Sequence, residues 1–407
     1  MRHRVVLPLV LLLVAGCGGA EPTVSVPGAA TSLATTTRLE VGDALLAATV
    51  DAAGAPVMVV DDGGTSPVLR RARDTGSGTV VGLVGTSAVQ SIWAISVAPD
   101  DSVVMIADGH SGTAVVRVDP AGSMTRYPVD LHTDPARTYG SRHPMRTYAA
   151  LTADASTAVL LTVPEQPRTS VTDGPHATGQ VELHRVDTTS GERTAFSTTQ
   201  LPGPGPFDVL GLAVSPDGDL VTVAAAVATD GAESGASVDV TALDAILMRF
   251  DAGLRSVDRI PLAREVMTGG GMPLDIDDSG TAYTVVTGRD ETGERGPRLL
   301  AVTRNATEAT VVARLGLLDE ESPLRVDRRG RFAYLPGWWS ARGLGVTVVD
   351  LRDGSTAAQV PLCDRGFLGG PGALAADGSR LLVSGTCSTV DEAESGEPSP
   401  STVLVLR

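Results

Sequence analysis

The sequence contains no lysine, because all 32 of its basic residues are arginine. This absence excludes Schiff-base chemistry on a lysine amine, and it excludes a Walker-type phosphate loop. Aromatic residues are also scarce, at 3% of the chain. The hydrophobic fraction is nevertheless 42%, so a core is available and must be filled mainly by Val, Leu and Ala.

Positive charge is in short supply overall, and the formal net charge is −16. An acidic surface repels the phosphates of nucleic acids and anionic lipid headgroups. We therefore expect no nucleic-acid partner and no membrane contact through the protein surface. Beyond the N-terminus, no apolar run is long enough to span a bilayer.

The N-terminus has the features of a secretory leader. A basic start, Met1 to Arg4, precedes an apolar run from Val5 to Val14 that is too short for a mature membrane span. The stretch from Leu13 to Cys17 resembles the lipobox of bacterial lipoproteins. The resemblance implies a signal peptide over residues 1–16 and a diacylglycerol on the sulfur of Cys17. The alternative is a plain secreted protein whose leader happens to contain a cysteine.

The segment after Cys17 is rich in Gly, Ala, Pro, Ser and Thr and has no apolar periodicity. This composition indicates a flexible tether over residues 17–36. Two acyl chains suffice for stable anchoring, so we expect an exported protein held at the outer face of the cell membrane by its lipid alone. The remaining residues, 37–407, form the folded part.

A hairpin pattern recurs along the folded part. The stretch from Gly211 to Ala226 contains two β-type runs around Pro216-Asp217-Gly218, and glycine supplies the positive φ of such a turn. Comparable turns recur every 50 to 60 residues or so, which indicates a repeat architecture. Their marker residues are Asp51, Asp100, Asp154, Asp217, Asp278, Arg328 and Asp377.

Each repeat has room for four antiparallel strands. The first strand carries small or β-branched residues, as in Leu212 to Val214, which suits strands that converge on a narrow channel. Outer strands diverge, so we expect their Arg, His and Asp residues, for example in Ile246 to Asp251, to lie on wet faces.

Leu212 to Gly218 and Val348 to Gly354 resemble the blades of bacterial YVTN-type and Trp-Asp-repeat-like β-propellers. The resemblance implies an all-β fold, a seven-bladed β-propeller, with six or eight blades as alternatives. The last repeat ends after its third strand, Thr402 to Leu406. We expect Thr36 to Val41 to supply the missing strand and close the ring, which removes an exposed sheet edge.

Two cysteines remain after Cys17, namely Cys363 and Cys387. An even number of cysteines in an oxidising compartment favours pairing, so we predict one disulfide. The alternative is a pair of isolated buried thiols, because sequence spacing alone does not place two Cβ atoms within bonding reach.

Long insertions gather on one face of the expected ring, and we expect the partner to bind there. Trp338 and Trp339 fall in one such insertion, from Pro336 to Gly343, where they would stack on a sugar or anchor a protein. The alternative is packing against the channel mouth or a neighbouring blade. Further candidates on this face, which would otherwise be solvated loop charges, are Asp208, Glu321, Arg142, His143 and Arg365.

The run Asp275 to Gly280 matches the first half of a calcium loop, with oxygen donors at Asp275, Asp277 and Ser279. The twelfth position is Val286 rather than an acid, and the run coincides with a repeat turn. Calcium is therefore a weak candidate, and we expect no cofactor.

The sequence predicts a binding or assembly module, in monomeric form, with no catalysis of its own. Its protein, glycan or small-molecule partner is not identified by the sequence. One alternative is a propeller hydrolase acting on a lactone or glycan, which would need three or more carboxylates or imidazoles converging at the channel. A purely structural envelope protein is a third class.

Overall fold

The computed structural model describes residues 35–40, 44–61, 67–71, 79–82, 91–109, 112–131, 145–164, 180–202, 207–228, 243–266, 272–290, 292–316, 323–340, 343–370, 372–375, 378–388 and 401–406. Every regular element within these ranges is a β-strand, as the hairpin pattern predicts. In the same ranges, no helical segment has the length and apolar character needed to pass through a bilayer.

The strands pair in chain order to form antiparallel sheets. Three four-stranded sheets come first: β2 (Ala44–Val50), β3 (Pro56–Asp61), β4 (Val68–Arg71) and β5 (Thr79–Gly82); β6 (Ser91–Val97), β7 (Val103–Asp108), β8 (Ala114–Val118) and β9 (Met124–Pro128); β10 (Met145–Leu151), β11 (Thr157–Pro164), β12 (Gln180–Asp187) and β13 (Arg193–Gln200).

The next strands form an eight-stranded sheet: β14 (Phe207–Val214), β15 (Leu220–Ala228), β16 (Leu243–Asp251), β17 (Ser256–Val266), β18 (Leu274–Ile276), β19 (Ala282–Arg289), β20 (Arg295–Val302) and β21 (Thr310–Arg314). Its two halves are joined by the single residue pair Arg264 and Arg289, between β17 and β19. The sheet is therefore two four-stranded sets whose backbones are paired at one residue pair and which share a hydrophobic cluster.

A further four-stranded sheet contains β22 (Arg325–Val326), β23 (Phe332–Ser340), β24 (Gly343–Asp350) and β25 (Thr356–Cys363). The last sheet joins both ends of the chain, because β1 (Thr35–Glu40) pairs antiparallel with β29 (Ser401–Leu406). Its other strands are β26 (Arg365–Phe367), β27 (Ala373–Leu374) and β28 (Leu381–Ser388). The predicted pairing of an N-terminal strand with the last strand is thus present.

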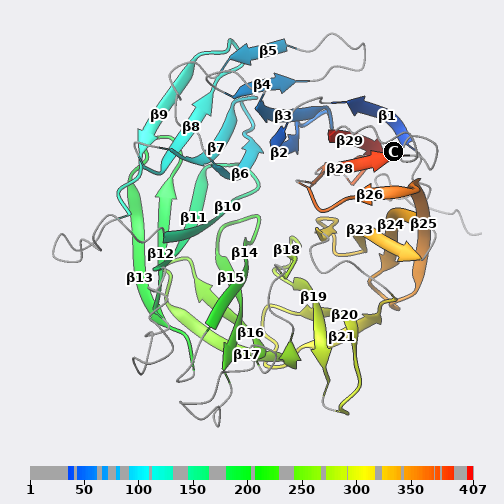
Figure 1. The fold of residues 1–407 in the computed structure, drawn as a ribbon. Helices are drawn as coiled ribbons and strands as arrows, with labels where there is room; N and C mark the ends of the chain where they lie inside the picture. The colour runs from blue at the N-terminus through cyan, green and yellow to red at the C-terminus, as the bar shows by residue number, and fades with distance from the viewer. Residues whose placement is uncertain are drawn as a thin grey trace, which may run out of the picture.

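The sheets are arranged around a common centre (Figure 1). Their first strands contact one another in the order β2, β6, β10, β14, β18, β22 and β27, and β27 in turn contacts β2. Small residues such as Ala47, Ala48 and Ala213 occupy these strands and are buried. The sequence prediction of small residues where strands converge is therefore confirmed at these positions.

The hydrophobic core lies between neighbouring sheets. Leu161 and Leu183, from β11 and β12, belong to the same buried cluster as Val223 and Phe250, from β15 and β16. All four side chains are inaccessible to solvent. At about 25 cal/mol for each Å² of apolar surface removed from water, burial of this kind is the main stabilising contribution.

Aspartates hold the tight turns that follow the first strands. Asp51 Oδ1 accepts hydrogen bonds from the backbone N–H groups of Ala53, at 2.9 Å, and Ala55, at 2.8 Å. Two turns lack glycine at the position that needs a positive φ, and Asp101 and Ala155 adopt φ values of 62° and 54° there. The turns are therefore kept even where the sequence departs from Pro-Asp-Gly.

Arginine side chains connect neighbouring sheets at these turns. Arg185 Nη1, from β12, donates to the carbonyl oxygen of Gly218 at 2.7 Å and to that of Ala252 at 3.1 Å. Both acceptors lie in turns of the next sheet. A similar contact joins the last sheet to the first, because Arg380 packs against Gly54. A Cβ atom added at Gly54 would lie 2.5 Å from the Cδ atom of Arg380.

Arg249, in β16, makes the most extensive of these connections. Its guanidinium pairs with both carboxylate oxygens of Asp258, with Nε at 2.7 Å from Oδ1. It also donates to the carbonyl oxygens of Thr303 and Arg304, each at 2.7 Å, and of Ala306 at 2.5 Å. A planar fork with five N–H groups suits this set of acceptors, whereas a lysine ammonium would not reach it.

The expectation that charged residues of the third strands lie on wet faces is wrong for two of them. Arg249 is 1% exposed and His184 is 0% exposed. Both lie between sheets, because the third strand is still covered by its neighbour. Burial, with Arg193 nearby, lowers the pKa of His184 to about 4, so its imidazole is neutral at neutral pH.

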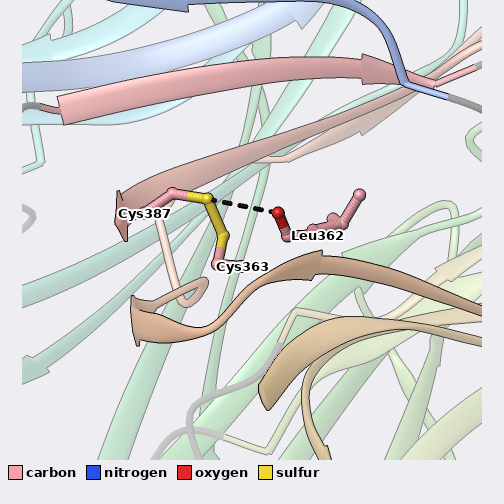
Figure 2. The surroundings of a disulfide bond; sticks show 3 residues. All are labelled: Leu362, Cys363 and Cys387. Carbon is pink, nitrogen blue, oxygen red and sulfur yellow. Dashed lines mark hydrogen bonds between the residues drawn. A yellow bond between two sulfur atoms is a disulfide. The ribbon is translucent and has the colours of Figure 1, made fainter. Parts of the chain in front are cut away.

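The predicted disulfide between Cys363 and Cys387 is present (Figure 2). It joins the end of β25 to β28, and therefore connects two sheets. Cys387 Sγ lies 3.7 Å from the carbonyl oxygen of Leu362. The two cysteines are 24 residues apart, a loop whose closure stabilises a fold by about 3 kcal/mol in the chain-entropy model.

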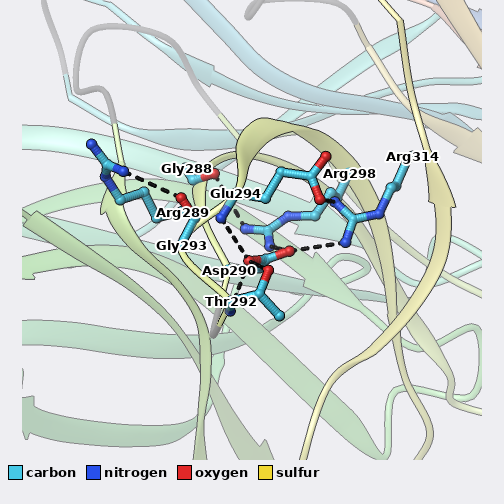
Figure 3. A network of polar contacts seen from close by, with 8 residues as sticks. All are labelled: Gly288, Arg289, Asp290, Thr292, Gly293, Glu294, Arg298 and Arg314. Atoms are coloured by element: carbon cyan, nitrogen blue, oxygen red, sulfur yellow. Dashed lines mark hydrogen bonds and ion pairs between the residues drawn. The ribbon is translucent and has the colours of Figure 1, made fainter.

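The segment from Gly288 to Pro297 is a tight hairpin between β19 and β20. Asp290 accepts hydrogen bonds from Thr292 and Arg314, and these bonds hold its pKa well below the usual range. Glu294 also contacts Arg314, with an N–O distance of 2.9 Å. Figure 3 shows these polar side chains close together at the hairpin. Ion pairs and hydrogen bonds thus hold this turn.

We predict that Arg249→Met destabilises the protein by about 3 to 5 kcal/mol, because the substitution leaves Asp258 and three carbonyl oxygens without their donor. Urea denaturation would measure the loss. Arg259→Met is the matched control, since Arg259 is exposed on the neighbouring strand and should change stability by no more than about 0.5 kcal/mol. Equal effects of the two substitutions would contradict the role given to Arg249.

Candidate functional site

The first strands enclose a cavity of about 530 Å³ at the centre of the molecule. It reaches the turns after β10, β14 and β22, where Ala153, Pro216 and Arg328 line it. Its volume falls within the range of small-molecule sites. Most of its lining is small or apolar, and the hydroxyl groups on it come from Thr49, Ser96 and Thr152.

Three charged side chains line the cavity among the described residues: Asp275, Arg325 and Arg328. Asp275 lies in β18, and Arg325 begins β22, the first strand of the next sheet. A charged residue in a strand facing the channel is exceptional here, because the other first strands present mainly Ala, Val, Ile and Leu. These residues are therefore the clearest candidates for recognising a ligand.

Asp275 is held by backbone donors. Its Oδ2 accepts from the N–H of Val326 at 2.8 Å, and its Oδ1 accepts from the N–H of Ile276 at 3.0 Å. The first bond connects β18 to β22. Protein surrounds the carboxyl group, although the residue keeps some surface toward the cavity. Burial raises the pKa of Asp275, and the nearby Arg325 opposes the rise.

Arg325 connects β22 to the segment that leads into β27. Its Nε and Nη2 donate to the carbonyl oxygen of Gly372, at 3.0 and 2.7 Å, and its Nη1 donates to that of Leu324 at 2.9 Å. Three of the five guanidinium N–H groups are used in this way. The other two, one on Nη1 and one on Nη2, find no acceptor among the described residues.

Trp93 also lines the cavity, from β6. The register between β6 and β7 shifts between Ile92 and Ala94, so Trp93 is the extra residue of a β-bulge. A similar shift in β2 isolates Leu46, which lines the cavity too. The Trp93 Nε1 atom is buried and has no hydrogen-bond partner within the described part of the chain. The bulges in β2 and β6 thus place two large apolar residues on the cavity wall.

Some of the residues proposed from the sequence lie outside the described ranges. These are Cys17, Arg142, His143 and Glu321. Their predicted roles stay predictions.

Trp338 and Trp339 lie within β23 and not in a loop, so that expectation is wrong. The backbone of Trp338 pairs with Leu344 of β24, because the hairpin between these strands continues to Ser340 and Gly343. The loop expected from Pro336 is strand as far as Ser340, and both Pro336 and Gly337 are accommodated in the pairing.

The other members of the proposed face are spread over separate sheets. Asp208 lies near the start of β14, as predicted, whereas Arg365 begins β26 and is exposed. Neither residue lines the central cavity. The described residues that line the central cavity are therefore not those of the proposed face.

The run proposed for calcium is organised by its own hydrogen bonds. Asp277 Oδ1 accepts from the backbone and hydroxyl groups of Ser279, at 2.9 and 2.6 Å, and from the N–H of Thr281 at 2.9 Å. Asp275 is directed to Val326 instead. Within the ranges described, no three His, Cys, Asp or Glu side chains are grouped to hold a metal ion.

Sequence reasoning missed Trp93, Asp275 as a channel residue, and Arg325. A signal for all three was present: each breaks the rule that first strands carry small or β-branched residues. Trp93 stands in Ser91 to Val97, and Arg325 is in a short run between Leu324 and Val326. A large or charged residue in a first strand is therefore a signal for a channel residue.

No family model matches the sequence, and no curated protein matches it. Among solved structures, it resembles an oligogalacturonate lyase from Vibrio parahaemolyticus, with a TM-score of 0.55 and 12% identity over 92% of this chain and 97% of that one. It also resembles the acylaminoacyl peptidase of Pyrococcus horikoshii, with a TM-score of 0.51 and 10% identity over 90% of this chain.

The chain spans about half of that peptidase, since the match covers 51% of its length. At such low identity the likeness concerns the fold alone. Together with the sheet arrangement, it defines the chain as a β-propeller-type all-β protein.

We predict that Asp275→Asn changes the pH dependence of stability. The pKa of Asp275 is raised in the folded protein, whereas an aspartate in the unfolded chain has a pKa of about 3.9. The folded protein therefore binds the carboxyl proton more tightly than the unfolded chain does. Wild-type stability should therefore fall relative to the variant as pH rises from about 4 toward 7. Urea denaturation at several pH values would measure the difference. A difference that stays constant with pH would contradict the raised pKa.

Proposed function

We propose that the chain is a seven-bladed β-propeller that binds a ligand in its central cavity and has no catalytic chemistry of its own. The observation that carries the proposal is the central cavity of about 530 Å³, lined by small and apolar residues together with hydroxyl groups and three charged side chains. Such a combination is typical of small-molecule binding sites. Ligand recognition by a rigid ring needs no large movement of the backbone.

Several contacts support the blade count and a closed ring. The cyclic contacts among the first strands, from β2 to β27 and back to β2, fit seven blades. The pairing of β1 with β29 fits closure by the N-terminal strand, since it supplies an outer strand that the C-terminal repeat lacks. The pairing covers the edge of β29, which would otherwise be the outermost strand of that sheet.

We further propose that the protein is an exported monomer held at the outer face of the cell membrane by a diacylglycerol on Cys17. The lipobox-like stretch before Cys17 supports the anchor. The disulfide between Cys363 and Cys387 supports an oxidising compartment. The tether would end before Thr35, where β1 begins, rather than at residue 36, and would separate the ring from the lipid surface.

The anchor is tested by expressing the full-length chain beside its Cys17→Ala variant in a bacterium with lipoprotein processing. We expect the wild type to incorporate a labelled fatty acid and to partition into the detergent phase, since two acyl chains give stable anchoring. The variant should do neither. Equal partitioning of both forms would support a plain secreted protein instead.

Ligand binding is tested by thermal shift of the purified protein against lactones, oligosaccharides, small carboxylates and divalent ions. We expect at least one small-molecule class to raise the melting temperature, because a ligand that binds only the folded state stabilises it. Trp93→Leu should abolish the shift, whereas Trp338→Leu should leave it. A shift that depends on Trp338 and not on Trp93 would move the site to the originally proposed face.

A propeller hydrolase acting on a lactone or glycan is the second candidate. Asp275 favours it, because a carboxyl group with a raised pKa inside a cavity is suited to donate or accept a proton. The lyase and peptidases among the structural neighbours are compatible with it, but at 10 to 13% identity they bear on the fold only. Turnover of a lactone or oligosaccharide that Asp275→Asn abolishes would establish this alternative.

A further inference from the structure

The charge on the cavity wall differs in sign from that of the whole protein. The chain has a net charge of −16, yet two of the three charged residues described on the wall are arginines. In an enclosed site with low-dielectric walls, the local charges determine which ligands are attracted. The cavity is therefore a locally positive region of an acidic protein.

The guanidinium of Arg325 is held in place, and only three of its five N–H groups have an acceptor among the described residues. Its bonds to the carbonyl oxygens of Gly372 and Leu324 hold the plane of the guanidinium. The two N–H groups that remain are on different nitrogen atoms, the arrangement that a carboxylate accepts from an arginine. Because the side chain is held in place, little rotamer entropy is lost when a ligand binds.

Asp275 does not neutralise Arg325 through a direct ion pair within the described structure. Both of its oxygens are directed to backbone N–H groups, those of Val326 and Ile276. The carboxyl group lies close enough to Arg325 to interact electrostatically. It therefore weakens the attraction of Arg325 for an anion without occupying the donors themselves.

The wall also offers apolar side chains to a ligand. Leu46, Ile92 and Trp93 line the cavity, and Leu46 and Trp93 are the extra residues of the β-bulges in β2 and β6. Inorganic anions gain nothing from such residues. A ligand with a hydrocarbon portion gains about 25 cal/mol for each Å² of apolar surface that it buries.

We propose that the cavity binds a small organic carboxylate, with its charged group at Arg325 and its apolar portion against Trp93, Ile92 and Leu46. The proposal rests on the proposed function, because it names the ligand class of the same cavity. It assigns Arg325 and Trp93 as specificity-determining residues and Asp275 as the residue that limits affinity for anions.

The test compares three probes of matched shape: 3-phenylpropionate, its uncharged amide and the cation 3-phenylpropylamine. Isothermal titration of the purified protein would give their affinities. We expect the carboxylate to bind about tenfold more tightly than the amide, as charge-assisted hydrogen bonds predict, and the amine to bind most weakly. Inorganic phosphate should bind more weakly than the carboxylate.

Three variants separate the contributions of the side chains. Arg325→Gln should remove the preference for the carboxylate. Arg365→Gln is the control, because Arg365 is exposed and does not line the cavity, and it should change the preference by about twofold or less. Asp275→Asn should strengthen carboxylate binding, because it removes a neighbouring negative charge. The melting temperature of the Arg325 variant checks that it folds. The effect expected of Asp275→Asn is measured on a different protein and does not depend on that check.

The outcomes distinguish the two proposals. Amide or amine binding as tight as that of the carboxylate, abolished by Trp93→Leu, would overturn the ligand class and leave cavity binding in place. Weaker carboxylate binding by Asp275→Asn would also overturn it. Failure of every probe to bind at millimolar concentration would contradict this inference and count against cavity binding, which the wider thermal-shift panel then decides separately.

Discussion

Convergence of the first strands on one channel is the constraint on which the rest of the structure depends. Strands that meet at a centre have no room for large side chains, so residues such as Ala47, Ala48 and Ala213 occupy them. The sheets then diverge outward, and Val, Leu and a few aromatic residues fill the wedges between them. The scarcity of aromatic residues in the sequence is therefore compatible with a full core. Large residues at the centre are exceptions that need a functional explanation.

The absence of lysine has a structural counterpart in the way the sheets are joined. Arg185 and Arg249 each bind carbonyl oxygens of the next sheet, which a planar guanidinium does with several bonds at once. Arg325 performs the same task at the cavity, where two of its N–H groups have no acceptor among the described residues. One residue type thus contributes both to the stability of the fold and to its candidate site. The two roles differ in burial and in how many donors remain.

Much of the fold was predictable because turn chemistry is local. The Pro-Asp-Gly type of turn and the two runs around it specify a hairpin within about twelve residues, and recurrence specifies the repeat.

The candidate site was not predictable in the same way. Asp275 and Arg325 are 50 residues apart in sequence and meet only because neighbouring sheets place their first strands side by side. The β-bulge at Trp93 depends on pairing with β7, which the sequence of β6 alone does not reveal. Trp338 and Trp339 misled for the opposite reason, because Pro336 and Gly337 suggested a loop where the hairpin continues.

The last sheet contains both ends of the chain and reaches the central cavity, since β1 completes this sheet and β27 lines the cavity. Amide hydrogen exchange of β1 tests this most directly. If β1 is an integral strand of a closed ring, the amides within Arg38 to Glu40 that donate to β29 should be protected nearly as well as those of β29 and should exchange only with global unfolding. The alternate amides face away from β29 at the edge of the sheet and should exchange faster. Rapid exchange of β1 while β28 and β29 stay protected would contradict ring closure by the N-terminal strand.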